Sequence, residues 1–456
     1  MESTFVEKLR QTLQIRNRGS VVRIELEADY DQWLLEQLQE GTELDNNSLF
    51  LVPLQSLMDF TGLSYLIRYK GFEERLAAPG SHTLPLTKSP VDRSNLLETL
   101  KEQDILLHHP YNSFDWVLDL LNQAAVDPYV SVIKMTIYRL ASPSAVVIAL
   151  CKAARQGKSV LVVIEAKARF DEENNLHTAR ELEQAGCHII YGASSVKVHA
   201  KAFIIVRQES QQTTRYVHLS SGNYNEETAQ NYADVGLLTT KEHYANDVAE
   251  FFNAITGHSF SKNYEHLLTK PCNLREELIA LVRQEVVNAK QGLPCGIVIK
   301  VNALEDKAII EVLYQAAHAG VPIRLIVRSI CCLVPGRSGL SENIAVRSIT
   351  GRYLEHARLF YFHNQGNPRV YVGSADMMLR SFEKRVEILF AIVDPFLKQQ
   401  VIGLLDYNLR DNVNAYLMRE DGMYVKQSPG DQIPFDIHQA FFQPTPTTIQ
   451  RKQILF

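Results

Sequence analysis

The sequence predicts an α/β fold built of two tandem domains, which follow a short α+β region at the N-terminus. Two observations predict it: short apolar strands alternate with helices that end in glycine, and this order of elements occurs twice. In addition, each copy carries the same polar motif. We expect the N-terminal region over residues 1–95, the first domain over 96–270 and the second over 271–456.

The N-terminal region contains one strand that can be predicted from its alternation. From Val22 to Ala28, apolar residues alternate with Arg23, Glu25 and Glu27, as in a strand with one buried face. Helical stretches flank it, and residues 85–90 form a linker containing proline and serine. Nothing in this region indicates chemistry.

The first copy of the repeat begins with a strand at 131–134. A helix through 145–150 follows and ends at Gly157, and a second apolar strand occupies 160–165. The second copy has the strand 297–300, a helix through 309–313 that ends at Gly320, and the strand 323–328. Such βαβ units predict a largely parallel sheet in each domain.

The polar motif is a histidine, a basic residue two positions later, and a turn of small residues after the next strand. Its parts are His199, Lys201 and 220–223 in the first copy, and His356, Arg358 and 373–376 in the second. Alternation along a strand places each histidine and its basic residue on one face. The two copies can therefore meet across a pseudo-twofold axis and direct both imidazoles at one phosphorus atom.

This pattern favours phosphoryl transfer through an enzyme intermediate. Such a reaction needs a nucleophile, a proton donor and positive charge around the phosphate oxygens. Histidine suits the first two roles, because its pKa lies near neutrality. Arginine suits the third: Arg139 and Arg169 follow predicted strands and Arg328 ends one, at the carboxyl ends where ligands of open α/β sheets gather.

The composition excludes some classes of protein. A net charge of −5 disfavours a general nucleic-acid binder. The first residues lack the basic and apolar segments of a signal peptide, and no apolar run is long enough to cross a bilayer. The six cysteines are scattered, as in a protein with reduced thiols. We therefore expect a cytoplasmic protein.

Taken together, the motifs resemble those of the polyphosphate kinase family, whose catalytic part has a phospholipase D-like fold. The likeness runs from about residue 20 to the C-terminus. The matching segments are 109–111, 133–139, 168–172, 196–201, 221–225, 354–358 and 374–376. The resemblance therefore implies two tandem phospholipase D-like α/β domains.

The resemblance also implies roles for single residues. His199 matches the histidine that becomes phosphorylated, and His356 the second essential histidine, which assists proton transfer and contacts the nucleotide. Tyr232 and Arg328 match residues that bind the nucleotide. His218 lies in a similar segment, where a structural and a functional role are both open.

Substrates and cofactor follow from the same resemblance. Arg139 and Arg169 match arginines at the Mg²⁺–phosphate site; because arginine cannot ligate Mg²⁺, they would contact the phosphate oxygens that hold the ion. The expected partners are ATP or ADP and inorganic polyphosphate, with no nucleic acid. We also expect a homo-oligomer, and leave a peripheral association with a membrane open.

Two other functions remain possible at this point. A phosphodiesterase of the phospholipase D superfamily usually has an aspartate seven residues after the motif histidine, where this chain has Val206 and His363. The other alternative is a non-catalytic polyphosphate-binding protein. It arises because the N-terminal domain usual in the family is not represented, and the chain begins within the helical domain that follows it.

Overall fold

The computed structural model describes residues 20–42, 44–52, 83–85, 87–166, 168, 171–192, 196–209, 212–257, 264–269 and 274–442. The chain divides into two compact units, one up to Pro79 and one from Gly80 onward. The expected boundary at 95/96 stays a prediction, and the one at 270/271 falls outside the described residues.

In the N-terminal unit, two parallel strands pack on one helix. Its elements are β1 (Ile24–Glu27), α2 (Gln32–Thr42), the 3₁₀ turn η1 (Asn46–Ser48) and β2 (Leu49–Val52). Ile24 and Leu26 point to the same face and bury against Leu35 of α2. The expected strand is therefore confirmed, with its alternate residues forming a small core.

The second unit begins with an α/β half built on an eight-stranded sheet. The strands of this half are β3 (Ile105–His109), β4 (Val130–Ile137), β5 (Ser159–Ile164), β6 (His188–Tyr191), β7 (Lys197–Val198), β8 (Lys201–Glu209), β9 (Gln212–Ser220) and β10 (Tyr232–Thr239). All but β7 belong to the eight-stranded sheet, and β15 (Leu354–Glu355) of the second half is its eighth strand. Its helical segments are η3 (Arg93–Asn95), α4 (Leu96–Glu102), α5 (Asp115–Val126), α6 (Ala145–Arg155), α7 (Glu172–Gln184), η4 (Thr228–Gln230) and α8 (Glu242–Ile255).

A second α/β half follows, on a nine-stranded sheet. The strands of this half are β11 (Leu267–Thr269), β12 (Ile297–Val301), β13 (Ile323–Val327), β14 (Ile344–Ile349), β15 (Leu354–Glu355), β16 (Arg358–Phe362), β17 (Arg369–Gly373), β18 (Arg385–Val386), β19 (Ile388–Ala391), β20 (Ala415–Met418) and β21 (Tyr424–Lys426). β15 pairs with the first sheet and β18 with β7, and the other nine strands form the second sheet. Its helical segments are α9 (Leu274–Lys290), α10 (Lys307–His318), η5 (Asn364–Gly366), α11 (Leu379–Glu383), α12 (Pro395–Arg410) and α13 (Ile437–Ala440).

The predicted repeat is confirmed in the order of these elements. The strand–helix–strand unit β4–α6–β5 corresponds to β12–α10–β13, and each strand pair is parallel. Gly157 and Gly320 follow the two helices with φ of +82° and +92°. Glycine adopts this left-handed conformation without the steric cost that other residues meet, so both helices end there.

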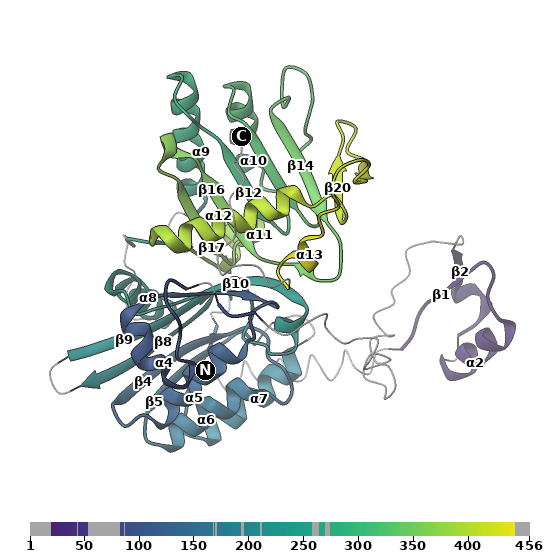
Figure 1. Cartoon of the computed structure of the whole chain (residues 1–456). Coiled ribbons are helices and arrows are strands. Elements are labelled where there is room, and N and C mark those ends of the chain that lie inside the picture. The colour runs from purple at the N-terminus through teal and green to yellow at the C-terminus, as the bar shows by residue number, and fades with distance from the viewer. Residues whose placement is uncertain are drawn as a thin grey trace. The chain divides into compact units, whose positions relative to one another are not determined.

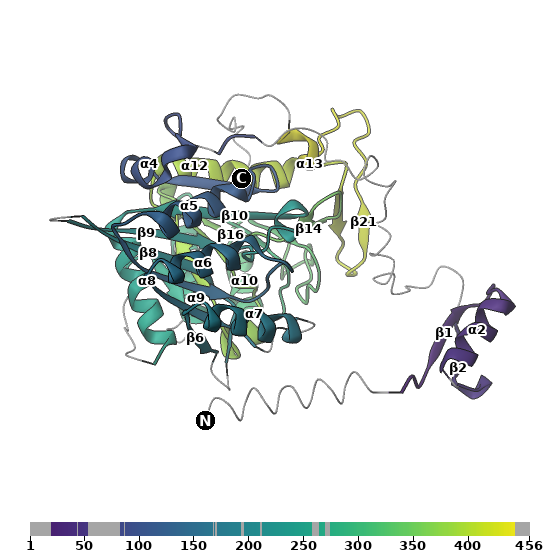
Figure 2. The same cartoon turned by 90° about the horizontal axis from the view of Figure 1, so that it is seen from below.

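Three apolar clusters form the core of this unit, one within each half and one shared by both. One cluster packs α5 and α6 on the outer face of the first sheet, and another packs α9 and α10 on the outer face of the second. A third joins α8, α12 and the inner faces of both sheets. Figure 1 shows α12 crossing the second sheet, and Figure 2 shows α5, α6 and α7 in front of the first. The halves therefore share a central core.

The expectation of largely parallel sheets is wrong. In the first sheet β4, β5 and β6 run parallel to each other and β15 pairs in parallel with β10, whereas the pairs β4–β8, β8–β9, β9–β10 and β3–β10 are antiparallel. The strands that follow His199 are joined by short connections, which favour antiparallel neighbours, whereas a parallel pair needs a long crossover such as a helix. No helix in the described part of the chain is long and apolar enough to span a membrane.

Candidate active site

The two motif histidines lie in exchanged connections between the halves. His199 and Ala200 follow β7, which pairs in parallel with β18 of the second half, and both backbone N–H groups donate to Val386 O (2.9 and 3.0 Å). His356 follows β15, which pairs in parallel with β10 of the first half. Its backbone N–H donates to Ala233 O (3.1 Å). Each half thus anchors the histidine of the other.

Each imidazole meets a carboxylate of the other half, next to the residue that binds its backbone. His199 Nδ1 lies 2.9 Å from Glu387 Oε2, one residue after Val386. His356 Nδ1 lies 2.9 Å from both carboxylate oxygens of Asp234, one residue after Ala233. The pairs are therefore crossed: the acid of each half orients the imidazole of the other. Such a contact fixes both the ring orientation and the position of its proton.

A serine from the small-residue turn supports each acid. Ser221 Oγ donates to Asp234 Oδ1 (2.6 Å), and Ser374 Oγ donates to Glu387 Oε2 (2.5 Å); in both halves the acid follows the serine by 13 positions. The hydroxyl of Ser221 also accepts the Val235 N–H (3.0 Å). The pseudo-twofold symmetry expected from the repeat thus extends to hydrogen-bonded atoms.

His199 has the electrostatic environment of a neutral imidazole. Burial lowers its pKa well below the usual value, and the positive charges of Lys201, Arg385 and Arg358 lower it further. When Glu387 is ionised, it accepts the proton on Nδ1, so the lone pair of Nε2 remains free. The ring of Tyr138 stands edge-on to the imidazole, with centroids 4.7 Å apart. His199 is therefore buried among polar groups and suited to act as a nucleophile.

The two acids differ in charge. Burial raises the pKa of Glu387 to about 7, because Lys201, Arg385 and Ser374 offset only part of the desolvation. Among the described residues, its Oε1 has no hydrogen-bond partner, and Arg385 Nη1 lies 3.8 Å from it. Burial also acts to raise the pKa of Asp234, but His356 and Ser221 outweigh it, and that pKa is lowered.

An ionised Asp234 favours a proton on His356 more than a partly protonated Glu387 favours one on His199. Burial still lowers the pKa of His356 to about 4, with Asp234 raising it and Arg358 lowering it. The two imidazoles are thus unequal despite the symmetry: His356 has the stronger anionic partner, which suits it to exchange a proton.

Positive side chains surround both rings. Lys201, 2% exposed, donates to the backbone oxygen of His199, and Arg358 Nη1 donates to that of His356 (2.8 Å). Arg358 also forms two hydrogen bonds with Asp376 at 3.1 Å, which fix its guanidinium. Arg358 Nη1 also lies 3.1 Å from His356 Nε2, and its charge lowers the pKa of both His199 and His356. The site therefore presents positive charge to an anionic group.

Two of the residues predicted to bind nucleotide lie beside His356. The rings of Tyr232 and His356 have centroids 5.3 Å apart. Arg328 Nε donates to Asn302 Oδ1 (2.7 Å), while Asn302 Nδ2 donates to His356 O (3.3 Å). Hence Arg328, Tyr232 and His356 gather at the C-terminal end of β13 and the N-terminal end of β10.

The two predicted phosphate arginines of the first half are only partly described. Arg139 follows Tyr138 at the end of β4, and its Nε pairs with Asp171 Oδ2 (2.7 Å). The guanidinium of Arg139 also lies 5.5 Å from the ring centroid of Tyr138, which contacts His199. Arg139 therefore lies at the same edge of the sheet as His199. Arg169 lies outside the described residues.

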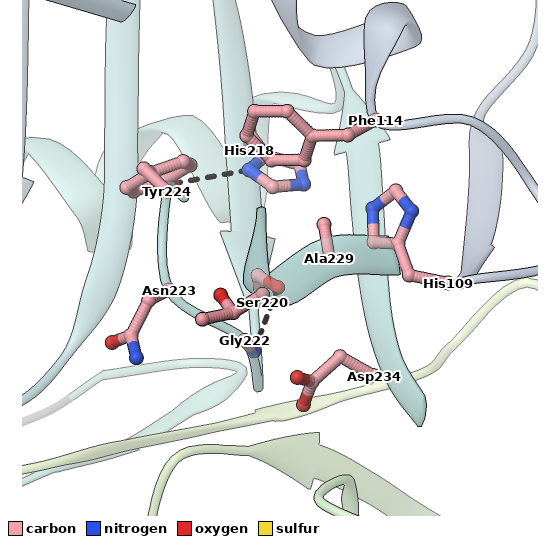
Figure 3. Close-up of a pocket in the computed structure, with 10 residues that line it drawn as sticks. His109, Phe114, His218, Ser220, Gly222, Asn223, Tyr224, Ala229 and Asp234 are labelled. Carbon is pink, nitrogen blue, oxygen red and sulfur yellow. Dashed lines mark hydrogen bonds between the residues drawn. The ribbon is translucent and has the colours of Figure 1, made fainter. Parts of the chain in front are cut away.

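Next to Asp234 lies a small cavity. About 10 Å³ of it is open to the centre of a water molecule, which is room for one water. Figure 3 shows Asp234 and His218 among its lining residues. His218 is 1% exposed, its Nδ1 lies 3.0 Å from Tyr224 Oη, and its ring packs against Phe203. This placement fits the structural role left open for His218.

Sequence reasoning missed the two acids and Arg385. The signal was present, since each acid lies 13 residues after the serine of its small-residue turn. The repeated motif ends at that turn and therefore does not include Asp234 and Glu387. Nothing in the sequence repeats Arg385, which becomes visible only where β18 meets β7.

The residues of the site also indicate how Mg²⁺ could bind there. Within the described ranges, no group of three or more His, Cys, Asp or Glu side chains could hold a metal ion. Mg²⁺ commonly binds to substrate phosphates and water with few protein ligands. The arginine-rich surroundings fit an ion carried on phosphate oxygens, with the guanidinium groups contacting those oxygens.

Comparison with known proteins gives two family matches that together cover most of the chain. Residues 95–261 match the family described as polyphosphate kinase C-terminal domain 1, and residues 267–436 match polyphosphate kinase C-terminal domain 2. The matched regions correspond to the two α/β halves described above.

Several relatives match over nearly the whole chain. A polyphosphate kinase of Parasynechococcus marenigrum is 40% identical over 428 residues, covering 91% of this chain and 60% of that protein. One of Staphylococcus haemolyticus is 41% identical, covering 93% and 58%. The crystal structure of polyphosphate kinase from Porphyromonas gingivalis matches with a TM-score of 0.79 and 32% identity, covering 92% of this chain and 64% of that one. The chain thus spans about 60% of the length of these relatives.

Proposed function

This chain belongs to the polyphosphate kinase family, and on that premise we propose that it reversibly transfers the γ-phosphate of ATP to inorganic polyphosphate through a phosphohistidine at His199. The observation that carries the proposal is the crossed pairing of His199 with Glu387 and of His356 with Asp234. This pairing turns two imidazoles from separate halves toward one polar site.

In the first step, the lone pair of His199 Nε2 attacks the γ-phosphorus in line. The bond between this phosphorus and the β,γ-bridging oxygen breaks, and ADP leaves. The imidazole gains positive charge as the P–N bond forms, and Glu387 stabilises it through the proton on Nδ1. Arg358, Lys201 and Arg385 offset the negative charge of the phosphoryl oxygens.

In the second step, the terminal oxygen of polyphosphate attacks the phosphoryl group, and the P–N bond breaks. His356 is suited to pass a proton to the departing oxygen of ADP and to receive one from the attacking oxygen. Asp234 holds its ring through Nδ1. Since one phosphoanhydride bond is broken and another is made, the same groups serve the reaction in both directions.

Substrate binding falls to the arginines and to Tyr232. Arg328 and Tyr232, beside His356, would contact the nucleotide, and Arg139 and Arg169 the phosphate oxygens. A fork of donors on a planar guanidinium matches phosphate geometry. Mg²⁺ on these oxygens would withdraw charge from the transferred group. We further propose, as general expectations for this family, a cytoplasmic location and a homo-oligomer.

Incubating the purified chain with ATP, Mg²⁺ and polyphosphate tests this function. The expected result is formation of ADP with longer polyphosphate, and formation of ATP from ADP and polyphosphate in the reverse assay. The His199→Ala variant should do neither. Binding of polyphosphate without turnover would indicate the non-catalytic alternative, and release of phosphate or phosphodiester products to water would indicate a hydrolase.

A further inference from the structure

A buried ion pair with a third polar member lies directly behind His356. Glu355 precedes His356 in the chain, and its Oε2 is 2.7 Å from Lys300 Nζ. Its Oε1 is 2.7 Å from Nε2 of His438, which belongs to α13 near the end of the described chain. Lys300, Glu355 and His438 are only 3%, 4% and 1% exposed. Both oxygens of this carboxylate are therefore engaged away from solvent.

The hydrogen bonds define the protonation of this triad, formed by Lys300, Glu355 and His438. The backbone N–H of Tyr353 donates to His438 Nδ1 (3.4 Å), so the imidazole proton lies on Nε2 and is donated to Glu355. Burial would raise the pKa of Glu355, but Lys300 and His438 outweigh it and bring the pKa to about 2. Both partners therefore stabilise the ionised form of Glu355.

The segment that carries His438 is itself firmly held. Asp411 accepts the N–H of Ile437 (2.9 Å), and Asp436 accepts that of His438 (2.9 Å). On the other side, the ring of Phe441 stacks on Tyr407 with centroids 5.1 Å apart. His438 is therefore a fixed support for Glu355, not a mobile surface group.

The first half folds without such a triad. Val198 stands before His199 at the position of Glu355, and its backbone N–H donates to Glu165 Oε2 (2.9 Å). Lys134 occupies the position of Lys300 on the equivalent strand. Since the first half forms this connection with an apolar residue, the fold of the connection does not require the charged triad. We therefore relate the triad to His356.

We propose that His438 is a positioning residue for His356, acting through Glu355. Glu355 belongs to β15, whose pairing with β10 places the His356 N–H on Ala233 O and its ring on Asp234. By fixing the Glu355 side chain, His438 fixes β15 and hence the imidazole that exchanges the proton. This inference rests on the proposed function and gives the C-terminal segment a part in it.

Two substitutions of nearly equal size separate positioning from general stability. His438→Gln places an amide N–H where Nε2 was and can still donate to Glu355. His438→Asn keeps a polar group facing the Tyr353 N–H but is too short to reach Glu355. Gln439→Ala serves as a control, because Gln439 is exposed on the same helix. Steady-state kinetics with ATP and polyphosphate gives kcat and KM for each variant.

We expect His438→Asn to lower kcat about 10- to 100-fold, as for other groups that orient a catalytic imidazole, with KM for ATP changed less than about twofold. His438→Gln should recover most of the lost kcat, and Gln439→Ala should match the unaltered chain. The double variant Asp234→Asn/His438→Asn should lose less than the product of the two single losses, because both act on His356.

Unchanged kcat in His438→Asn would overturn the inference, as would equal losses in the Asn and Gln variants. Losses that multiply in the double variant would also overturn it, because they would show an effect unrelated to His356. The thermal unfolding midpoint of each variant, measured in parallel, identifies any variant that is unfolded. If His438→Asn is unfolded, the kcat of His438→Gln decides instead. No turnover by the unaltered chain would contradict the proposed function itself, and this inference with it.

Discussion

Replacing Glu387 with glutamine tests how the nucleophile is prepared. In the chain as it stands, Oε2 of Glu387 lies 2.9 Å from His199 Nδ1 and accepts the Ser374 hydroxyl at 2.5 Å. Glutamine can keep its carbonyl oxygen at this position, because Ser374 and His199 both donate there. The substitution therefore preserves the geometry and removes the charge that stabilises the imidazolium of phosphohistidine.

The size of the effect follows from hydrogen-bond energies. A hydrogen bond to a charged group contributes about 1.5–3 kcal/mol, against about 0.5–1.5 kcal/mol for a neutral one. The difference between corresponding ends of these ranges, about 1–1.5 kcal/mol, corresponds to a rate lower by about 5- to 13-fold. A rapid-quench measurement of phosphoryl uptake from ATP gives this rate directly. The Glu420→Gln variant is the control, since Glu420 is exposed.

The pH dependence adds a second signature. Because burial raises the pKa of Glu387 to about 7, this group becomes protonated as the pH falls through that value. It then donates to His199 Nδ1, which moves the imidazole proton to Nε2 and removes the attacking lone pair. The uptake rate should therefore rise with pH through about 7, and this limb should vanish in Glu387→Gln. A variant that keeps both the rate and the limb would refute the reasoning.

Four further predictions concern the surroundings of the two imidazoles. Asp234→Asn should lower kcat about 10- to 100-fold through misorientation of His356, and an unchanged kcat would contradict the role of this acid. Gly222→Ala would place a Cβ 2.6 Å from Asp234 Oδ2, so steady-state turnover should fall; a rate equal to that of the unaltered chain would show that the carboxylate can move without consequence. Arg328→Lys keeps the charge but loses the planar fork, and should raise KM for ATP; unchanged KM would exclude a bidentate contact. Glu387→Gln should also raise the free energy of unfolding above pH 7, by at most about 3 kcal/mol. The reason is that the folded carboxyl has a pKa of about 7 against the ordinary 4.5, so its ionisation destabilises the folded chain. Between those two values the folded state binds the proton more tightly, so the stability of the unaltered chain falls as pH rises through this window; thermal melts of both proteins at pH 5 and 8 test the sign.

The repeated strands, helices and histidines could be predicted because each follows from local pattern. Gly157 and Gly320 end their helices in conformations that favour glycine, and the apolar strands before and after them are buried on both faces. The repeat also predicted the matching positions of His199 and His356 in the two halves. These features depend on residues that lie close together in the sequence.

What sequence reasoning missed depends on contacts between distant segments. Glu387 is 188 residues from the histidine that it orients, and Asp234 is 122 residues from its own. A crossed exchange of strands between two halves leaves no local periodicity. The mixed sheets were missed for a related reason, since the apolar pattern of a buried strand is the same for parallel and antiparallel neighbours.

The central claim is that one of two paired imidazoles carries the phosphoryl group. Labelling the purified chain with γ-³²P-ATP, followed by peptide mapping under alkaline conditions that preserve phosphohistidine, tests it most directly. We predict label on His199 alone, absent in His199→Ala and retained in His356→Ala. Label on His356 or on a carboxylate, or turnover without any labelled protein, would contradict the account.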